Sequence, residues 1–209
     1  MSSKADEKPK LLSSKAVFAP VVDVFEVPEI ARLNRELVEA AKDWQAQDPG
    51  ITRSNFAGWH SDGNIFKRID APFLEICRQF VDACKTPLTR YLTKEKLRTK
   101  KLQLEGWINI NGPHAYNQMH THDRFELSGV YFVKAPQPSH KLSGVLQFLN
   151  PSYRSGPYSE LFEKMNPQAD TVTPIEGQML IFPSTMPHWV LPNDENDERI
   201  SIAFNVRLN

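Results

Sequence analysis

Three histidines have the residue type and spacing of a metal site. His120 and His122 are separated by one residue in NQMHTHD, and His188 follows the turn FPSTMP. In a strand, residues i and i+2 point to the same face and lie about 7 Å apart at Cα, so two imidazoles can meet at one ion. The alternative is a pair of polar residues at the exposed end of a strand, and spacing alone does not decide between the two.

Arg199 and Ser201 suggest a second kind of chemistry, eleven residues after His188. A guanidinium is a rigid, bidentate partner for a carboxylate, and a hydroxyl two residues further along a strand can add one hydrogen bond. A metal beside such a clamp implies an anionic organic ligand. The alternative is a surface ion pair, because four acidic residues lie between positions 194 and 198.

The segments that carry these residues are predicted to be strands. The half of the chain from Leu102 to Asn209 contains eight candidates that are bounded by turn residues. They lie near residues 102–111, 116–122, 127–133, 144–149, 170–174, 178–182, 188–192 and 199–208. Eight strands without an internal repeat predict a jelly roll, so the expected fold class is mainly β with flanking helices.

Two helices and an extended segment are expected before these strands. Residues 17–27 are rich in β-branched and aromatic side chains, and Pro20 restricts them to a sheet edge or a break. An apolar stripe from Ile30 to Trp44 predicts one helix. A second is predicted from about residue 71 to 91, with Pro87 expected to kink or split it.

Two strands have one apolar face and one polar face. LQLEGWININ (102–111) and RISIAFNVRL (199–208) both alternate, and their polar residues include Asn109, Asn111, Arg199 and Ser201. Solvent is the ordinary environment of such a polar face. The other interpretation is that both polar faces line a cavity.

Taken together, these motifs resemble the Fe(II)- and 2-oxoglutarate-dependent dioxygenases, which have a double-stranded β-helix (jelly-roll, cupin-like) fold. The family pattern is His-x-Asp/Glu, a distal His and then Arg-x-Ser. Here the pattern reads His120-Thr121-His122, His188 and Arg199-Ile200-Ser201. SNFAGWHS (54–61), WININ (107–111), HTHDRFELSGVYFV (120–133), GQMLIFPSTMPHWV (177–190) and RISIAFN (199–205) look like an oxygenase subfamily of bacteria and phages. The resemblance covers about residues 17–207.

The resemblance implies a ligand set for Fe(II). His120 and His188 match iron ligands, but His122 stands where the superfamily normally has a carboxylate, with Asp123 one residue beyond. Strand alternation turns Asp123 to the opposite face unless the strand bulges or ends. Three histidines are therefore the expected ligands, with Asp123 as the alternative third ligand. Because His122 fills the third position, halogenation is disfavoured.

The resemblance also implies residues for the cosubstrate. Arg199 and Ser201 match the anchor of the distal carboxylate of 2-oxoglutarate. Asn109 and Asn111 resemble positions that contact the cosubstrate in the nucleic-acid-demethylating branch, and Tyr131 resembles a tyrosine that bonds the same carboxylate.

Three further residues are predicted to contact the substrate. Trp59 and His60 lie in a connection rich in glycine and asparagine that matches the subfamily, and Arg207 lies on the polar face of the last strand. Without the subfamily match, His60 would be read as a surface loop residue.

The implied function is a hydroxylase that consumes O2 and 2-oxoglutarate, releases succinate and CO2, and acts on a small molecule or a peptide. Two alternatives stay open. One is a cupin-like enzyme with three histidines that does not use 2-oxoglutarate. The other is a catalytically inactive domain that binds a metal and a 2-oxo acid.

Composition restricts partners and compartment. Lys plus Arg and Asp plus Glu number 25 each, so the net charge of zero disfavours nucleic acid as a partner. No apolar run of 18 residues exists, and the N-terminus is polar, which indicates a cytoplasmic protein without a membrane partner. Cys77 and Cys84, two helical turns apart, are expected to be reduced. Residues 1–15 are expected to form a flexible polar tail and residues 16–209 a single jelly-roll domain, whose oligomeric state the sequence does not determine.

Overall fold

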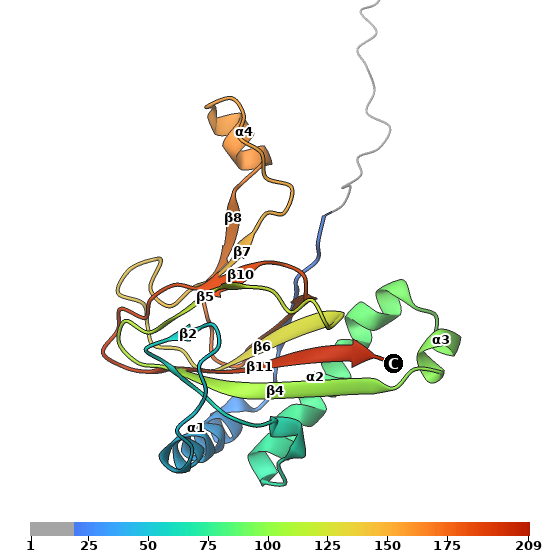
Figure 1. Ribbon diagram of the computed structural model, residues 1–209, viewed down its shortest axis with the longest axis vertical. Coiled ribbons are helices and arrows are strands. Elements are labelled where there is room, and N and C mark those ends of the chain that lie inside the picture. Colours follow the sequence, from blue (N-terminus) through green and yellow to red (C-terminus); the bar gives the residue numbers. More distant parts are fainter. Residues whose placement is uncertain (1–18) are drawn as a thin grey trace, which may run out of the picture.

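The computed structural model describes residues 19–209, so the predicted polar tail at 1–15 lies outside the described residues. The described part consists of two antiparallel sheets that face each other, with helices on the outer side of one of them (Figure 1). This arrangement confirms the predicted class, a mainly β jelly roll with flanking helices.

One sheet has six strands and the other has five. The six-stranded sheet contains, in spatial order, β1 (Asp23–Glu26), β9 (Gln178–Pro183), β6 (Leu127–Lys134), β11 (Arg199–Leu208), β4 (Leu102–Asn111) and β3 (Trp59–His60). The five-stranded sheet contains β2 (Asn55–Phe56), β5 (Tyr116–His120), β10 (His188–Val190), β7 (Leu146–Leu149) and β8 (Ala169–Val172). All eight strands predicted between residues 102 and 208 are present, and β1 is an edge strand, as Pro20 suggested. The short strands β2 and β3 were not predicted.

Two long helices cover the outer face of the six-stranded sheet. They are α1 (Ile30–Gln47) and α2 (Ala71–Tyr91), both close to their predicted positions (Figure 1). Pro87 does not split α2, and the Thr89 hydroxyl donates to the Lys85 carbonyl (2.8 Å) in the turn around it. Among residues 19–209, no helix is both long and apolar enough to cross a membrane.

Three shorter elements were not predicted: η1 (Ile65–Lys67), α3 (Lys94–Arg98) and α4 (Glu160–Met165). α4 lies at the tip of an arm that projects from the sandwich between β7 and β8 (Figure 1).

The apolar side chains form two clusters. The larger one lies between the helices and the six-stranded sheet, where Phe80 of α2 stacks on Phe204 of β11 with ring centroids 4.4 Å apart. The smaller cluster lies between the sheets and includes Phe148 and Phe182. Cys84 is buried and unpaired, and burial raises the pKa of its thiol to about 12, which makes it an inert packing residue.

Strand register places the polar faces of β4 and β11 on the side of the sheet away from the helices. Ile202 and Phe204 point into the cluster on the helix side. The residues that alternate with them point toward the other sheet. Among these, Arg199 lies opposite Asn111 and Ser201 lies opposite Asn109 on the neighbouring strand. The polar faces therefore line the interior of the sandwich instead of facing bulk solvent.

Candidate metal centre and cosubstrate site

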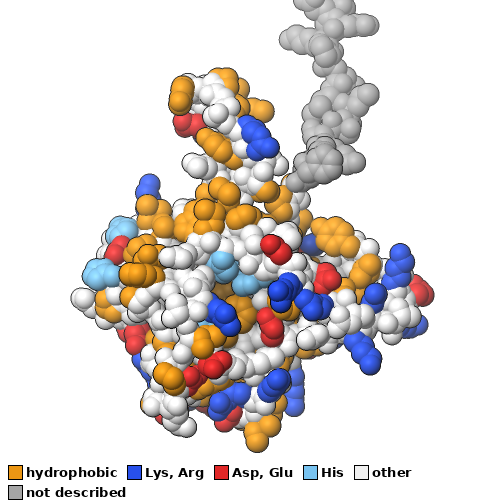
Figure 2. All heavy atoms as spheres, viewed as in Figure 1, with side chains coloured by type: hydrophobic (Ala, Val, Ile, Leu, Met, Phe, Trp, Pro, Cys, Tyr) orange, Lys and Arg blue, Asp and Glu red, His pale blue; other side chains and the backbone are white. Residues whose placement is uncertain are grey.

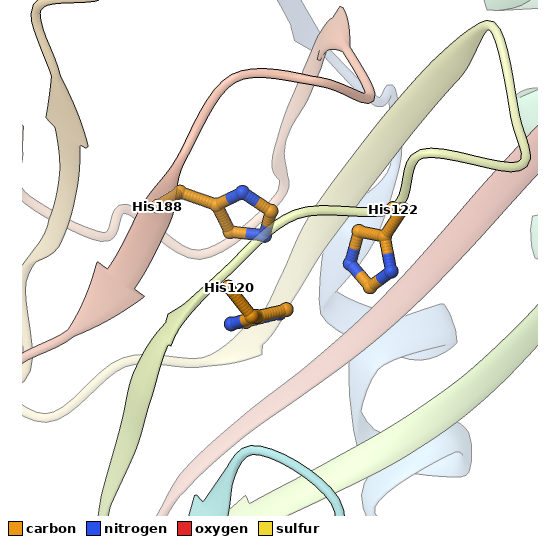
Figure 3. A group of neighbouring side chains, drawn as sticks. All are labelled: His120, His122 and His188. Atoms are coloured by element: carbon orange, nitrogen blue, oxygen red, sulfur yellow. The ribbon is translucent and has the colours of Figure 1, made fainter.

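Strand pairing brings the three histidines together. β5 and β10 are antiparallel neighbours in which His120 lies directly opposite His188, and His122 lies two residues beyond the end of β5. One ring nitrogen from each histidine lies within 4.8 Å of the others. Figure 3 shows the three imidazoles grouped around a common space, two from neighbouring strands and one from the following connection. This is the donor set of a metal centre with three nitrogen ligands.

Backbone carbonyls hold two of these rings. His120 Nδ1 lies 2.7 Å from the Gln118 carbonyl, and His188 Nδ1 lies 2.8 Å from the Met186 carbonyl. A proton on Nδ1 in each bond leaves the Nε2 lone pair free for a metal. His122 is held differently, because its backbone N–H donates to the Ser184 carbonyl (2.9 Å) and its ring packs beside Trp107.

The electrostatics of the site favour neutral imidazoles. Burial, and secondarily the neighbouring histidines, lower the pKa of His122 to about 3 and the pKa of His188 to about 4. Burial also lowers the pKa of His120. The rings are thus deprotonated near neutral pH, which is the state that binds a metal ion.

Asp123 lies apart from the other candidate ligands. β5 ends at His120, and Asp123 is exposed in the turn that follows His122. The only cluster of potential metal ligands in residues 19–209 is the histidine triad. The structure therefore offers His122, and not Asp123, as the third donor.

Arg199 is a buried cation without an anion. Its side chain lies over the Phe132 ring, and the residue is 2% exposed. Nη1 donates to the Ser201 hydroxyl (3.1 Å), while Nε and Nη2 have no hydrogen-bond partner among the described residues. Burial lowers the pKa of Arg199 to about 10, so the guanidinium is still charged at neutral pH. Burying an uncompensated charge is unfavourable, so an anionic ligand that paired with Arg199 would stabilise this arrangement.

The alternative prediction, that Arg199 forms a surface ion pair, is wrong. Two of the acidic residues that precede it bind lysines instead, since Glu198 pairs with Lys42 and Asp197 pairs with Lys134. Arg199 points inward because it occupies a polar position of β11, where alternation directs side chains between the sheets.

The anion clamp and the histidines open into the same cavity. The cavity has a volume of about 940 Å³ and runs along β4 and β11. Its lining includes Arg199, Ser201, Asn109 and all three histidines. Asn111 lies beside this lining and donates to the Asn117 side chain (3.1 Å). Asn109 and Asn111 each have a buried side-chain oxygen without a partner in the described part of the chain.

Tyr131 does not join the site. Its ring packs near Phe80 on the helix side of β6, and its hydroxyl donates to the Asn34 side chain (2.5 Å). Burial raises the pKa of Tyr131 to about 12. Because alternate residues of a strand point to opposite faces, Tyr131 faces away from the cavity, and the structure does not support the predicted contact with the cosubstrate.

The three predicted substrate residues are in different environments. His60 lines the cavity and stacks on Trp107 with ring centroids 5.3 Å apart. Trp59 points the other way and donates from Nε1 to the Asp48 carbonyl (2.9 Å). The Arg207 guanidinium is held by the Arg124 carbonyl (2.8 Å) outside the cavity lining. The structure thus brings only His60 to the cavity.

Glu105 and Asn205 also line the cavity, although the sequence did not single them out as site residues. They form a cross-strand pair between β4 and β11. Alternation already placed Glu105 on the same face as Asn109, so the signal was present, but the extent of the cavity along the strands was not visible in the sequence.

The fold is shared with oxygenases of known structure. A prolyl-4-hydroxylase from Pseudomonas putida superposes with a TM-score of 0.61 at 17% identity, covering 89% of this chain and 91% of that one. A viral collagen prolyl hydroxylase from Paramecium bursaria Chlorella virus-1, solved with 2-oxoglutarate, gives a TM-score of 0.56 at 11% identity, with 88% and 94% coverage. HygX from Streptomyces hygroscopicus, solved with nickel, 2-oxoglutarate and hygromycin B, gives a TM-score of 0.60 at 10% identity, with 89% and 82% coverage.

A family model matches the part of the chain that holds the candidate site. The fold and the triad beside Arg199 are those of a jelly-roll protein with a candidate metal centre. Residues 105–205, which hold the triad and Arg199, match the family model described as "Putative 2OG-Fe(II) oxygenase", which confirms the resemblance seen in the sequence. The search of curated proteins gives no match. At the level of the family, the predicted Fe(II) and 2-oxoglutarate are confirmed.

Proposed function

We propose that this protein is an Fe(II)- and 2-oxoglutarate-dependent hydroxylase. In this proposal His120, His122 and His188 hold Fe(II), and Arg199 with Ser201 holds the distal carboxylate of 2-oxoglutarate. The observation that carries the proposal is the buried Arg199 guanidinium, whose Nε and Nη2 have no partner within residues 19–209 and which opens into the same cavity as the triad.

The residues present fit both groups. Imidazole nitrogen suits Fe(II), and three neutral ligands leave more positive charge on the ion than two histidines and a carboxylate do. A dianionic cosubstrate therefore contributes more to holding the ion here. When bound, Fe(II) and 2-oxoglutarate supply the oxidising chemistry with O2, and 2-oxoglutarate is converted to succinate and CO2.

The protein's own residues bind, orient and exclude water. The carbonyls of Gln118 and Met186 fix the orientation of two histidine rings. Ser201 fixes one nitrogen of Arg199 and leaves two others for a carboxylate. Asn109 adds a polar side chain to the same wall, while Phe182 and Val190 make part of the lining apolar.

The substrate is proposed to be a small molecule or a peptide. A cavity of about 940 Å³ is in the range that takes a cosubstrate together with a second organic molecule. Structural neighbours support both options: a prolyl hydroxylase from Trichoplax adhaerens was solved with a peptide fragment, and HygX with hygromycin B. His60 is the predicted substrate residue that lines this cavity.

The test is the fate of 2-oxoglutarate. Purified protein with Fe(II), O2 and 2-oxoglutarate should form succinate above the level seen when Ni(II) replaces Fe(II). Succinate should fall to that background in a His188→Ala variant, which lacks one proposed ligand. O2 uptake that is unchanged when 2-oxoglutarate is omitted would favour the cupin-like enzyme. Binding of 2-oxoglutarate without succinate would favour the inactive binding domain.

A further inference from the structure

Glu105 is a half-buried carboxylate that lines the cavity without a partner. It lies on β4, two residues before Trp107 and opposite Asn205 of β11. Within the part of the chain that the structure describes, its side chain forms no hydrogen bond and no ion pair, and it is the only acidic residue of the cavity lining. A carboxylate that lines a cavity without a partner is free to bind a cation that enters the cavity.

The neighbouring side chains do not supply that partner. Arg207 follows Asn205 by two residues on the same strand face, but the Arg124 carbonyl and the Phe125 ring hold its guanidinium. Asn205 accepts a hydrogen bond from the Ser128 hydroxyl (2.7 Å).

Arg53 and Lys67, which do line the cavity, are exposed, and neither forms an ion pair with Glu105. Figure 2 shows histidine side chains reaching the surface near the centre of one face, with basic and acidic side chains around them. This setting is accessible to a ligand that enters from solvent.

Glu105 and Arg199 lie in different parts of the cavity. Arg199 pairs with Asn111 and Glu105 pairs with Asn205, and the two pairs are six positions apart on β11, about 20 Å along the strand. Trp107 lies between these two residue pairs on β4, and His122 packs beside it. A dianion held by Arg199 would not be placed against Glu105, because like charges repel. The end of the cavity at Glu105 is thus left for the substrate.

His60 adds a second acceptor on this wall. Its Nδ1 lies 2.9 Å from the Ser61 carbonyl, and a proton there leaves the Nε2 lone pair as an acceptor. The ring stacks flat on Trp107, at an interplanar angle of 13°. Hydrogen-bond acceptors therefore lie on both sides of Trp107. His60 lies on the side of Asn109, and Glu105 lies on the side of Gln103.

We propose that Glu105 is the residue that selects the substrate, and that the substrate carries a cationic nitrogen group, an amine or a guanidinium, that pairs with its carboxylate. This inference rests on the proposed function, in which the histidine triad oxidises another part of the same molecule. A cation is preferred to a neutral donor because hydrogen bonds between two charged groups are shorter and stronger.

Matched pairs of small probes test the inference by calorimetry, with protein loaded with Mn(II) and 2-oxoglutarate in the absence of O2. The cationic probes are Nα-acetyl-lysine amide and Nα-acetyl-arginine amide, and their neutral counterparts are Nα-acetyl-norleucine amide and Nα-acetyl-citrulline amide. At least one cationic probe should bind about tenfold more tightly than its counterpart, and binding should weaken with added salt. This comparison needs no variant.

Two substitutions then identify the carboxylate responsible. The Glu105→Gln variant should reduce the preference to within about twofold. The Glu39→Gln variant, which removes the same charge from an exposed position on α1, should keep the full preference.

Equal binding within each pair, no binding by either cationic probe, or a preference that survives Glu105→Gln would each overturn the inference. Repeating the titrations without metal and 2-oxoglutarate separates the two proposals. Cation preference in a protein that does not bind 2-oxoglutarate would contradict the proposed function and leave the role of Glu105 standing.

Discussion

Arg199 is the residue whose surroundings depend most clearly on a ligand. It is charged, buried and bonded only to Ser201 among the described residues. In a ligand-free protein this arrangement lowers stability, because a buried charge without a counterion is unfavourable. In the proposed function, the carboxylate of 2-oxoglutarate supplies the missing counterion.

Replacing Arg199 should therefore separate stability from binding. An Arg199→Met variant should weaken 2-oxoglutarate binding at least about 100-fold, because both unpaired donors are lost. Its ligand-free melting temperature should equal or exceed that of the wild type, since the buried charge is gone. Calorimetric titration and thermal unfolding measure the two effects. A variant that melts lower and still binds 2-oxoglutarate would show that Arg199 serves the fold instead.

The third metal ligand can be tested by paired substitutions. A His122→Ala variant should bind Mn(II) or Fe(II) at least about tenfold more weakly, because one of three donors is removed. An Asp123→Ala variant should bind metal within about twofold of the wild type, because Asp123 is exposed in the turn. Metal titrations on both variants decide the question, and the opposite ranking would make Asp123 the ligand.

Local spacing and alternation singled out the three histidines, Arg199 and Ser201 as candidates, and the family resemblance supplied their expected roles. Tyr131 was misplaced for a physical reason: between Ser128 and Lys134, both faces of β6 carry only glycine, aliphatic and aromatic side chains, so the local pattern does not show which face meets the cavity. Glu105 was missed because its importance comes from the absence of a partner, which only the folded arrangement reveals.

The six-stranded sheet has one face that lines the cavity and one apolar face that packs against the helices. The polar residues of β4 and β11 keep their positions because the opposite face of the same strands is fixed against α1 and α2. Phe80 of α2 is fully buried and contacts Phe204 and Tyr131. Helix docking thus sets the position of the strand that carries Arg199.

Truncating that contact should be strongly destabilising. A Phe80→Ala variant should lose about 3–5 kcal/mol of unfolding free energy, because it leaves a large cavity under the sheet. Leu74→Ala on the same helix should lose less than about 1 kcal/mol, because Leu74 is 41% exposed. Urea denaturation followed by circular dichroism measures both. Equal losses would mean that α2 does not support the sheet through Phe80.

The long elements were predictable because their apolar periodicity extends over many residues. Both helices and the ten-residue strands β4 and β11 follow such patterns, whereas the shorter later strands were predicted from the turn residues that bound them. The strands β2 and β3 have two residues each, and no periodicity can be read from so short a segment. They matter for the site, since β3 pairs with β4 and brings His60 opposite Asn109.

At the scale of the whole molecule, the proposed ligands bridge the two sheets. The triad lies on β5, β10 and the connection after β5, which belong to the five-stranded sheet, whereas Arg199 lies on β11 of the six-stranded sheet. A metal and a cosubstrate that contact both would link the halves of the sandwich, and any ligand that binds only the folded state raises its stability.

Metal and 2-oxoglutarate together should therefore raise the melting temperature. At about 100 times the dissociation constant, a single ligand adds about 2.7 kcal/mol, which for a chain of this size is roughly 5–10 °C. Mn(II) serves as the metal because it does not turn over, and a chelator should reverse the shift. Stabilisation by 2-oxoglutarate that is just as large in the Arg199→Met variant would argue against the clamp.

Visible spectroscopy tests most directly whether 2-oxoglutarate binds to iron in this cavity. Fe(II) and 2-oxoglutarate are added to the protein without O2, and the visible spectrum is recorded against protein with Fe(II) alone and against the Arg199→Met variant. The wild type should show a weak charge-transfer band, typical of a 2-oxo acid chelated to iron, and the variant should lose it. Bound iron without any such band would contradict the assignment of this cavity to 2-oxoglutarate.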